Sequence, residues 1–349
     1  MSVKDSIISS VLSSKFGFEQ KWGPPDFLQE GRRWKPWYDS LIHMVNPRHK
    51  LDPFLLEMAR ADYVNGFLPH LKLRSLTDMM RPLTLDENVN GIPGVRFIDA
   101  LNMRTSMGFP LTGVKSDYLI ERDPQPDEKG NIVRKFDPTL GLEAEMMECE
   151  KRYLVGERCH PIFKACLKDE PTKKTKKKVR VFEAAPIVLQ LLIRKYFLPI
   201  IRFVSMVPIT SECAVGINCF GTEWAELHDR VASFGANRIV AGDYSKWDLR
   251  LPAHLVLVAF DVLIRLAHLS GHYTENDMEI MRGIATDVAY PIIAFNGTLM
   301  ELHGSNPSGQ NLTAHLNSIC NSLLLRMGFF HLTGKTKSFR EFVHAFTYG

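Results

Sequence analysis

The chain has 349 residues, 45% of them hydrophobic and 23% charged, which is the ordinary composition of folded globular proteins and excludes a mainly disordered chain. This length is too great for one small domain and suits two or three lobes around a shared core. A net charge of +4, from 43 Lys and Arg against 39 Asp and Glu, is weak evidence for a nucleic-acid partner, so the placement of the basic residues matters more.

Neither the cysteines nor the apolar segments indicate a secreted or membrane protein. The six cysteines are scattered, and none forms a CxxC pair or shows the spacing of zinc ligands, which favours free thiols in a reducing compartment. The N-terminus lacks the apolar core of a signal peptide. We find no apolar run that approaches the ~18 residues of a membrane span, so we expect a soluble, intracellular protein with no integral membrane segment.

The N-terminal third shows few periodic patterns. Residues 1–50 hold three of the five tryptophans among Gly and Pro, which predicts an irregular segment anchored by aromatic side chains. The polar, turn-rich stretch 123–137 predicts an exposed hairpin or loop. Asp137-Pro138 then resembles a cap followed by a first helical residue, and predicts a helix that continues over residues 141–154.

Helices dominate the expectations for the second half. The apolar stretch 184–204 predicts a buried helix, and Pro252 is placed to open another that ends near His268. Thr274, with Asp277 three residues later, resembles a capping box for the next helix. A further helix is expected over about residues 310–327.

Three segments of the second half have the character of strands. Residues 237–242 form a short β-type run that ends on Asp243. Residues 290–302 form two strand-like runs around Asn296-Gly297, which is the strongest short signal for a hairpin. The last eight residues alternate like a strand that approaches a turn.

The first candidate site is the pair Asp243 and Asp248 in the string DYSKWD. Carboxylates at the end of a strand can bind Mg²⁺ and leave coordination positions for substrate phosphates. Alone, the pair is weak evidence, because a strand end followed by a helix-capping Asp is favoured about two to one.

The second candidate is the string GSNPSGQNLTAHLNS at residues 304–318, in which a Gly/Ser/Pro loop feeds into a helix. Thr313 and Asn317 are four residues apart and share a helix face. Such a loop can bend around a nucleotide, and the helix face can hydrogen-bond a sugar. The alternative is a polar loop with an ordinary helix cap.

The third candidate is the basic string at residues 168–186, where seven of the first thirteen residues are Lys or Arg. Such a cluster suits a phosphate backbone or a triphosphate. For the lysines alone, a solvated basic face or a nuclear-targeting tract is about as probable. The apolar VRVF that follows predicts that the cluster leads into a strand.

Two shorter strings are weaker. TSMGFP, at residues 105–110, predicts a tight turn whose backbone N–H groups could face a nucleic-acid strand, although most such strings are only turns. Gly334-Lys335-Thr336 is similar to a phosphate-binding P-loop, but the earlier glycine is misplaced and the string follows a helix, so we expect no NTPase there.

In chain order, these strings resemble the motifs of RNA-dependent RNA polymerases from picornavirus-like (Picornavirales) positive-strand RNA viruses. The correspondence covers motif G (105–110), motif F (168–186), motif A (243–248), motif B (305–318) and the start of motif C (Tyr348-Gly349). Asp243 and Ser308 are 65 residues apart and Asn317 and Tyr348 are 31 apart, which fits the family. Residues 160–349 carry the match, and the N-terminal part is assigned only by position.

The resemblance implies an α+β, right-hand polymerase fold. Residues 1–190 would form the fingers, with motifs G and F, and residues 191–349 an incomplete palm, interrupted near 280–297 by a short fingers insertion. An antiparallel sheet packed on helices would place the strand before Asp243 beside the terminal hairpin. The thumb, which follows motif C in this family, would be absent.

The resemblance also implies template-directed transfer of nucleotides to an RNA 3′ end by two Mg²⁺ ions, with Mn²⁺ as a substitute. Its catalytic residues would be Asp243 and Asp248. The metal ions would be bound by Asp243 and Tyr244, and the ribose of the nucleotide by Asp248, Ser308, Gly309, Thr313 and Asn317. The NTP phosphates would be bound by Lys168, Lys173 and Arg180, and the template RNA by Thr105, Ser106 and Gly108. The remnant of motif C would be Tyr348 and Gly349.

The implied partners are template and product RNA and NTPs, with a protein primer and other viral replication proteins as further candidates. The implied location is the host cytoplasm, at membrane-associated replication complexes.

Two departures from the family pattern shape these expectations. Motif C stops before its two aspartates, so we expect the 349 residues to bind RNA or NTPs weakly and not to polymerise. Pro171 stands where several relatives have Leu-Arg, which leaves open whether Lys173, Lys174 or Lys176 contacts phosphate.

Two other functions stay open. A reverse transcriptase or DNA polymerase shares the palm chemistry, but the polar Asp248 and Asn317 favour ribonucleotides. A non-catalytic RNA-binding fragment is the alternative from a different class.

Overall fold

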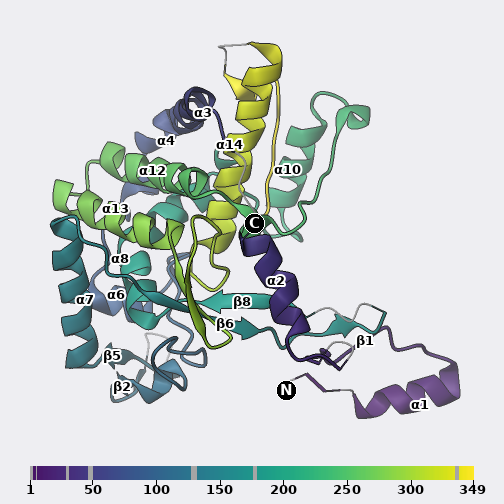
Figure 1. Ribbon diagram of the computed structural model, residues 1–349. Helices are drawn as coiled ribbons and strands as arrows, with labels where there is room; N and C mark the ends of the chain where they lie inside the picture. The colour runs from purple at the N-terminus through teal and green to yellow at the C-terminus, as the bar shows by residue number, and fades with distance from the viewer. Residues whose placement is uncertain are drawn as a thin grey trace.

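A computed structural model describes residues 3–4, 6–28, 31–45, 50–126, 132–175, 179–334 and 338–349. The fold is α+β: a packed group of helices lies beside a small mixed sheet (Figure 1). In the described residues, the one sheet with more than two strands has the order β10-β9-β6-β8. Its strands are β6 (Ile162–Leu167), β8 (Val181–Ala184), β9 (Ile292–Phe295) and β10 (Thr298–Glu301).

The sheet joins two segments that are far apart in the sequence. β6 pairs antiparallel with β8 and parallel with β9, so that Lys164 lies between Ala184 and Ala294. β8 confirms the strand predicted after the lysine cluster. β9 and β10 confirm the predicted hairpin, whose turn residues Asn296 and Gly297 both have positive φ, as a two-residue hairpin turn requires.

Helices α8, α12, α13 and α14 form the centre of the core. α8 (Ile187–Met206) confirms the predicted buried helix, and α12 (Ala253–Ser270) begins directly after Pro252. α13 (Glu275–Ala289) carries the predicted capping box between Thr274 and Asp277. α14 (Thr313–Thr333) begins three residues later than predicted and extends six residues further. Two outer helices, α3 (Pro53–Asn65) and α7 (Leu140–Leu154), pack against α14 and α13 respectively.

Among the helices of the described residues, only α12 is long and apolar enough to cross a membrane. The sequence did not predict such a segment. The helix contains Asp261 and Arg265, and 56% of it is buried. It packs against α3, α8, α13 and α14, so these properties suit a core helix.

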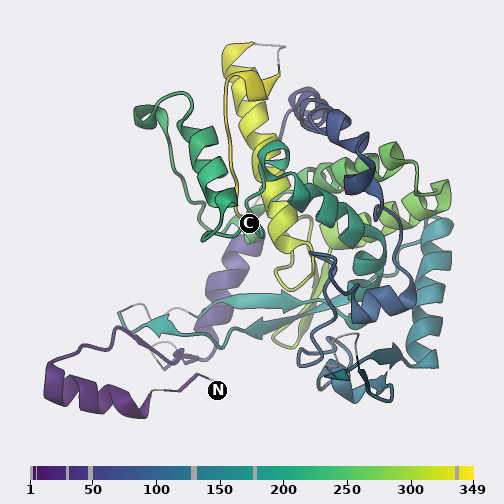
Figure 2. The ribbon, with the colours of Figure 1, turned by 180° about the vertical axis from the view of Figure 1, so that it is seen from behind.

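The expectation of an irregular segment over residues 1–50 is wrong. It contains α1 (Ile7–Phe16), β1 (Trp22–Gly23) and α2 (Lys35–Val45). α1 has local end signals that a search for apolar periodicity does not register: Ser6 caps its first turn and Gly17 closes its last. α1 has no buried residue and stands away from the helical core in both views (Figures 1 and 2).

The anchoring role of the tryptophans is partly confirmed. The ring of Trp37, on α2, packs edge-on against Phe295 with 5.2 Å between ring centroids. α2 thereby lies over β8 and α11 (Trp247–Arg250). β1 pairs with β7 (Thr172–Lys173), which places Trp22 beside Lys173.

Short elements fill the segment between α3 and α7. The predicted hairpin at 123–137 is present: β2 (Leu119–Glu121) pairs with β5 (Phe136–Pro138), and β3 (Gln125–Pro126) pairs with β4 (Ile132–Val133). The remaining short helices there are α4 (Leu68–Leu71), α5 (Arg74–Thr77), α6 (Leu85–Asn90) and η1 (Lys115–Asp117).

The predicted start of α7 is wrong by a few residues. Asp137 and Pro138 belong to β5, and the helix begins at Leu140 after Thr139. The Asp137 carboxylate forms an ion pair with Arg122, which directly follows β2, instead of capping the helix.

The strand predicted at 237–242 does not form, and neither does the expected palm sheet within the described ranges. Residues 236–238 form a 3-10 turn, η2, and residues 239–246 have no regular structure. The side chain of Val240 is 93% exposed. A β-type sequence becomes a strand only when another backbone accepts and donates the ladder hydrogen bonds, and no described segment lies along this one.

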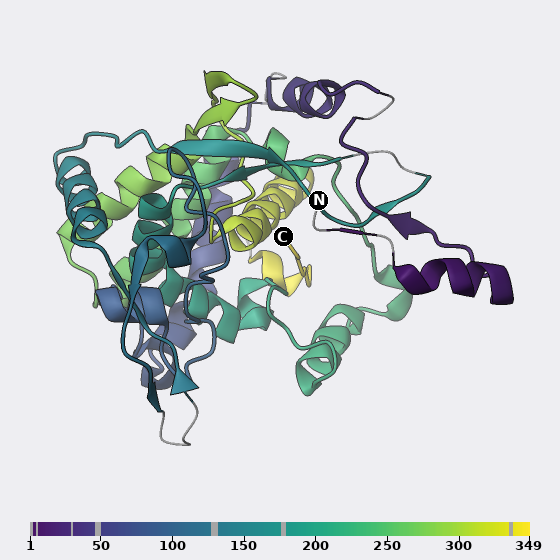
Figure 3. The same cartoon turned by 90° about the horizontal axis from the view of Figure 1, so that it is seen from below.

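The last residues also differ from the expected strand. After η3 (Phe339–Glu341) the chain makes a single bridge, between Thr347 and Cys213, which follows α9 (Pro208–Ser211). Gly349 donates its N–H to Ser318 Oγ at 3.0 Å, so the C-terminal end lies against α14 (Figure 3). α10 (Thr222–Ala232) lies on the outside of the molecule (Figure 2).

Candidate active site

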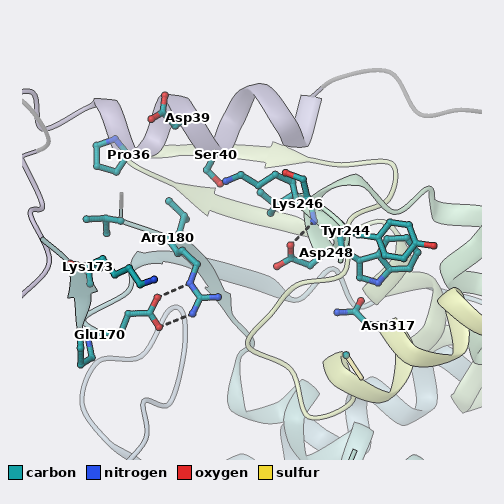
Figure 4. A pocket seen from close by; sticks show the side chains of 18 of the residues that line it. Pro36, Asp39, Ser40, Glu170, Lys173, Arg180, Tyr244, Lys246, Asp248 and Asn317 are labelled. Carbon is teal, nitrogen blue, oxygen red and sulfur yellow. Dashed lines mark hydrogen bonds and ion pairs between the residues drawn. The ribbon is translucent and has the colours of Figure 1, made fainter. Parts of the chain in front are cut away.

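An open pocket of about 810 Å³ lies where α2, β7, β8, α11 and α14 meet (Figure 4). It brings together residues from four of the five motif strings. The predicted site residues that line it are Lys173, Arg180, Tyr244, Asp248, Asn317 and Gly349. Residues separated by more than 170 positions in the sequence therefore share one cavity.

Asp248 enters this pocket from the start of α11 (Figure 4). Burial raises the pKa of its carboxyl group, while the Leu249 N–H and the nearby charge of Lys246 act in the opposite direction. Its backbone carbonyl accepts the N–H of Asn306 at 2.8 Å, and Leu251 O accepts that of Ser305 at 2.7 Å. These bonds fix the motif A segment against the motif B loop.

Asp243 and Tyr244, the predicted metal ligands, lie differently. Asp243 is exposed and does not line the pocket. The Tyr244 ring stacks on Trp247 with 4.4 Å between centroids, and its hydroxyl donates to Asn321 Oδ1 at 3.3 Å. No group of three or more His, Cys, Asp or Glu side chains that could hold a metal ion occurs in the described ranges. The described residues therefore do not fit a complete metal centre, and Asp243 stays a predicted ligand.

The predicted phosphate ligands of motif F are organised by Glu170. Its carboxylate receives two bonds from Arg180, at 2.6 and 2.7 Å, and an ion pair from Lys168 at 3.1 Å. The hydrogen bonds from Arg180 and Lys168 lower the pKa of Glu170. Arg180 lines the pocket, whereas Lys168 does not. Two anchored cations beside a cavity can bind a polyanion at little further entropic cost.

Of the two described lysines left open by Pro171, Lys173 lines the pocket and Lys174 does not. Its ammonium nitrogen lies 5.5 Å from the centroid of the Trp22 ring. Lys174 donates its backbone N–H to Lys21 O at 2.9 Å. Lys176 lies outside the described residues, as do Lys335 and Thr336 of the dismissed P-loop string.

The predicted ribose-binding residues fall into two groups. Asp248 and Asn317 line the pocket, whereas Ser308, Gly309 and Thr313 do not. The Thr313 hydroxyl donates to Pro307 O and Gln310 O, at 2.9 and 3.0 Å. Gly309 N–H donates to Glu183 O at 2.9 Å, and a side chain at Gly309 would collide with the β8 backbone. In this arrangement Ser308, Gly309 and Thr313 hold the conformation of the motif B loop and do not face the pocket.

The predicted template residues of motif G form a turn that is fixed to the start of α8. Gly108 has a φ of 81° and lies against the backbone of Ala185, where no side chain would fit. The Ile187 N–H donates to Met107 O at 2.8 Å. Thr105 and Ser106 are hydrogen-bonded by a buried lysine for which the sequence predicted no role.

That lysine is Lys115, whose side chain is 2% exposed. Its ammonium group donates to Thr105 Oγ1 at 2.6 Å and to Ser106 O at 3.0 Å. Burial, and then the charge of Arg194, lowers the pKa of Lys115 to about 8. Nothing in the sequence around Lys115 indicates burial, because a single lysine before Ser and Asp is typical of exposed turns.

Glu183 is a second buried residue for which the sequence predicted no role. It lies on β8 within the motif F string and is fully buried. Burial and the nearby charge of Asp248 raise the pKa of Glu183 to about 7. Pro36, Asp39 and Ser40 of α2 also line the pocket and were missed, because α2 itself was not predicted.

The C-terminal residues are held close to this site by a buried ion pair. Arg326 of α14 donates to both carboxylate oxygens of Glu212, at 2.7 and 2.6 Å. The carbonyl of Glu212 in turn accepts the Thr347 N–H at 2.8 Å. Gly349, two residues on, lines the pocket near Asn317.

Comparisons with known proteins connect most of this chain to viral proteins. The family model for viral RNA-dependent RNA polymerases matches residues 68–349. The genome polyprotein of deformed wing virus is 27% identical over 285 residues, which cover 76% of this chain and 10% of that protein. The RNA1 polyprotein of Satsuma dwarf virus is 30% identical over 258 residues, covering 72% of this chain and 12% of that protein.

Among solved structures, the sicinivirus 3Dpol RNA-dependent RNA polymerase superposes with a TM-score of 0.64 at 20% sequence identity. The superposition covers 90% of this chain and 61% of the sicinivirus chain, and it supports a right-hand polymerase fold. The chain thus spans about three fifths of the solved polymerase and a small part of each polyprotein. With most of its length matched by the family model, the chain belongs to the family of viral RNA-dependent RNA polymerases.

Proposed function

We propose that this chain serves template-directed synthesis of RNA from NTPs during viral genome replication. The observation that carries the proposal is the 810 Å³ pocket, in which the acidic side chain of motif A, the amide of motif B and the cations of motif F face one cavity. A nucleoside triphosphate needs those three kinds of group, for its sugar hydroxyls and for its phosphates.

The residue roles follow from the placement of each group. Asp248 and Asn317 would bind the ribose 2′-hydroxyl, and Arg180 and Lys173 would bind the phosphates, with Lys168 steadying Glu170. A site that hydrogen-bonds a hydroxyl strongly rejects the analogue that lacks it, which favours ribonucleotides over deoxyribonucleotides and argues against a reverse transcriptase. Thr105, Ser106 and Gly108 would contact the template strand.

Metal chemistry is part of the proposal, in the form that the family resemblance implies. Two Mg²⁺ ions, or Mn²⁺ in their place, would activate the primer 3′-hydroxyl and neutralise the triphosphate. This chain would contribute the Asp243 carboxylate and the Tyr244 backbone carbonyl. Because the described residues do not gather a complete ligand set, we propose that the 349 residues alone bind RNA or NTPs weakly and do not polymerise.

The wider setting is also proposed. We assign residues 1–190 to fingers and 191–349 to an incomplete palm, with a short insertion near 280–297 returning to the fingers. The partners would be template and product RNA, a protein primer and other viral replication proteins, at membrane-associated complexes in the host cytoplasm. The relatives named above are viral polyproteins, which supports other viral replication proteins as partners.

The test is nucleotide incorporation on an RNA template with Mg²⁺, measured for the 349-residue chain and for the chain extended by the codons that follow Gly349 in its genome. We expect the extended chain to incorporate NTPs and Asp243→Ala to abolish incorporation. Asp123→Ala, which changes an exposed aspartate near the 119–138 hairpins, is the matched control.

Three results would count against the proposal. If the extended wild type is inactive, or if activity is indifferent to Asp243, a non-catalytic RNA-binding fragment is the better description. Incorporation by the 349-residue chain itself would contradict its predicted inactivity.

A further inference from the structure

Three amide side chains in the motif B region are buried beside the pocket. Asn306 is 1% exposed, and Gln310 and Asn317 are each 6% exposed. Each amide has one end that accepts hydrogen bonds and one that donates them, and burial makes an unsatisfied end costly. The orientation of each amide therefore depends on what its neighbours can offer.

Backbone groups of fixed polarity set these orientations. The Leu312 N–H can only donate, and it donates to Gln310 Oε1 at 2.7 Å. Gln310 Nε2 must then face the other way, and it donates to Asn306 Oδ1 at 3.0 Å.

A second backbone group, the carbonyl of Thr313, fixes the orientation of the Asn306 amide. Thr313 O can only accept, and it accepts from Asn306 Nδ2 at 3.2 Å. The same Nδ2 donates to Asn317 Oδ1 at 2.9 Å. The three amides thus form a one-directional relay, which we call the amide relay, defined by Gln310, Asn306 and Asn317.

We propose that the amide relay determines sugar specificity by holding Asn317 Oδ1 inward, so that its Nδ2 is the end presented to the pocket. Asn306 and Gln310 are then positioning residues, since neither lines the pocket. Asn317 and Asp248 enter the cavity from α14 and α11 and lie near one another (Figure 4). A donor beside an acceptor matches a hydroxyl group, which both accepts and donates. This inference rests on the proposed function, because it concerns how that site reads a ribose.

If the amide relay exists, Gln310→Glu should reverse the orientation of the Asn306 and Asn317 amides. One oxygen of the new carboxylate still accepts from Leu312 N–H, but the other now faces Asn306 Oδ1. Asn306 can satisfy the carboxylate only by turning its Nδ2 toward it, which gives up the bond to Thr313 O. Asn306 Oδ1 then faces Asn317, whose amide must also turn and present Oδ1 to the pocket beside Asp248.

The experiment compares kcat/KM for an NTP and its 2′-deoxy analogue in the extended chain. For Gln310→Glu, and for Asn306→Asp, which breaks the relay one step later, we expect the preference for the ribonucleotide to fall about tenfold or more, as for the loss of one hydrogen bond to a hydroxyl. Asn311→Asp adds the same charge at an exposed neighbouring position and should leave the preference unchanged.

A purely structural role would lower both kcat/KM values together and leave their ratio intact. An unchanged ratio in both relay variants, with the wild type active, therefore overturns the inference and leaves the proposed function standing.

An extended wild type that incorporates nothing would overturn the proposed function instead, and thermal unfolding of the 349-residue chain at pH 8 would then decide the relay. We expect the melting temperature to fall in Gln310→Glu and in Asn306→Asp, and to change little in Asn311→Asp. The Gln310→Glu, Asn306→Asp double variant sets two carboxylates against one another and should lose more than the sum of its parts. Additive losses would show that the two side chains are not bonded and would refute the relay.

Discussion

Glu183 and Ser308 are joined by two hydrogen bonds to one carboxylate oxygen, since Glu183 Oε2 accepts both the Ser308 backbone N–H at 3.3 Å and its hydroxyl at 3.2 Å. The other oxygen, Oε1, is buried without a hydrogen-bond partner. The pair connects β8, in the motif F string, to the motif B loop. The charge state of one buried carboxyl group therefore affects the contact between two motifs.

The first prediction concerns pH and Glu183→Gln. The pKa of Glu183, about 7, lies above its ordinary value of 4.5, so the native state holds this proton more tightly than the unfolded state does. The stabilisation is complete below about pH 4.5 and is lost as the pH rises through 7. Between pH 4.5 and 8, the free energy of unfolding of Glu183→Gln should gain up to about 3 kcal/mol relative to the wild type.

Urea unfolding at several pH values measures this difference. Glu145→Gln, at an exposed position of α7, is the control and should follow the wild-type profile. If Glu183→Gln also runs parallel to the wild type, the buried carboxyl group does not titrate in this range.

The second prediction concerns the ion pair between Arg326 and Glu212. The Arg326 side chain is completely buried and Glu212 is 3% exposed, and Arg326 also binds Asp62 at 2.8 Å. Arg326→Met removes this partner from the buried Glu212 carboxylate and from the half-buried Asp62, which should cost about 3–5 kcal/mol of unfolding free energy. Denaturant unfolding checks this, with the exposed Arg265→Met on α12 expected to change stability by less than about 0.5 kcal/mol. A loss below about 1 kcal/mol for Arg326→Met would mean that the cluster contributes little.

The third prediction concerns Arg180 and the phosphates. Glu170 holds the Arg180 guanidinium at the pocket with two bonds, so the cation is positioned before any ligand arrives. Arg180→Ala should raise KM for NTPs in the extended chain about tenfold, the loss of one charge-assisted interaction. Arg134, which pairs with Glu121 in the 119–138 hairpins, offers a matched control in Arg134→Ala. Equal effects of the two changes would exclude a specific phosphate contact at Arg180.

The fourth prediction concerns Lys115, which bonds Thr105 and Ser106 from within the protein. Lys115→Met removes both bonds while keeping the volume of the side chain. Binding of template RNA by the extended chain, followed by fluorescence anisotropy, should weaken about three- to tenfold, the cost of one or two lost hydrogen bonds. KM for NTPs should stay unchanged, and so should RNA binding by Lys151→Met, which changes an exposed lysine of α7. A rise in KM without a change in RNA affinity would place the role of Lys115 elsewhere.

The sequence predicts best those elements that carry their own end signals. Pro252, the Thr274 capping box and Asn296-Gly297 each act within a few residues, and each gave a correct boundary. The strand at 237–242 failed because strands depend on a neighbouring segment, which the local pattern does not contain.

In the candidate site, too, local sequence signals were predictive and contacts between distant segments were not. The motif strings predicted residues that share one pocket, including Asp248 and Asn317. They did not predict Asp39 or Ser40, whose nearness to Asp248 arises only when α2 docks on α11. The roles of Lys115 and Glu183 were also missed, because whether a charged residue is buried is decided by the whole fold.

The bond from Arg326 to Asp62 joins residues 264 positions apart. Ribosomes add roughly 5–20 residues per second, so Asp62 is synthesised roughly 13–50 s before the arginine that neutralises it. Throughout that interval α3, which carries Asp62, has no α14 to pack against. We therefore expect the emerging chain to be a client of chaperones until α14 docks against α3 and α12.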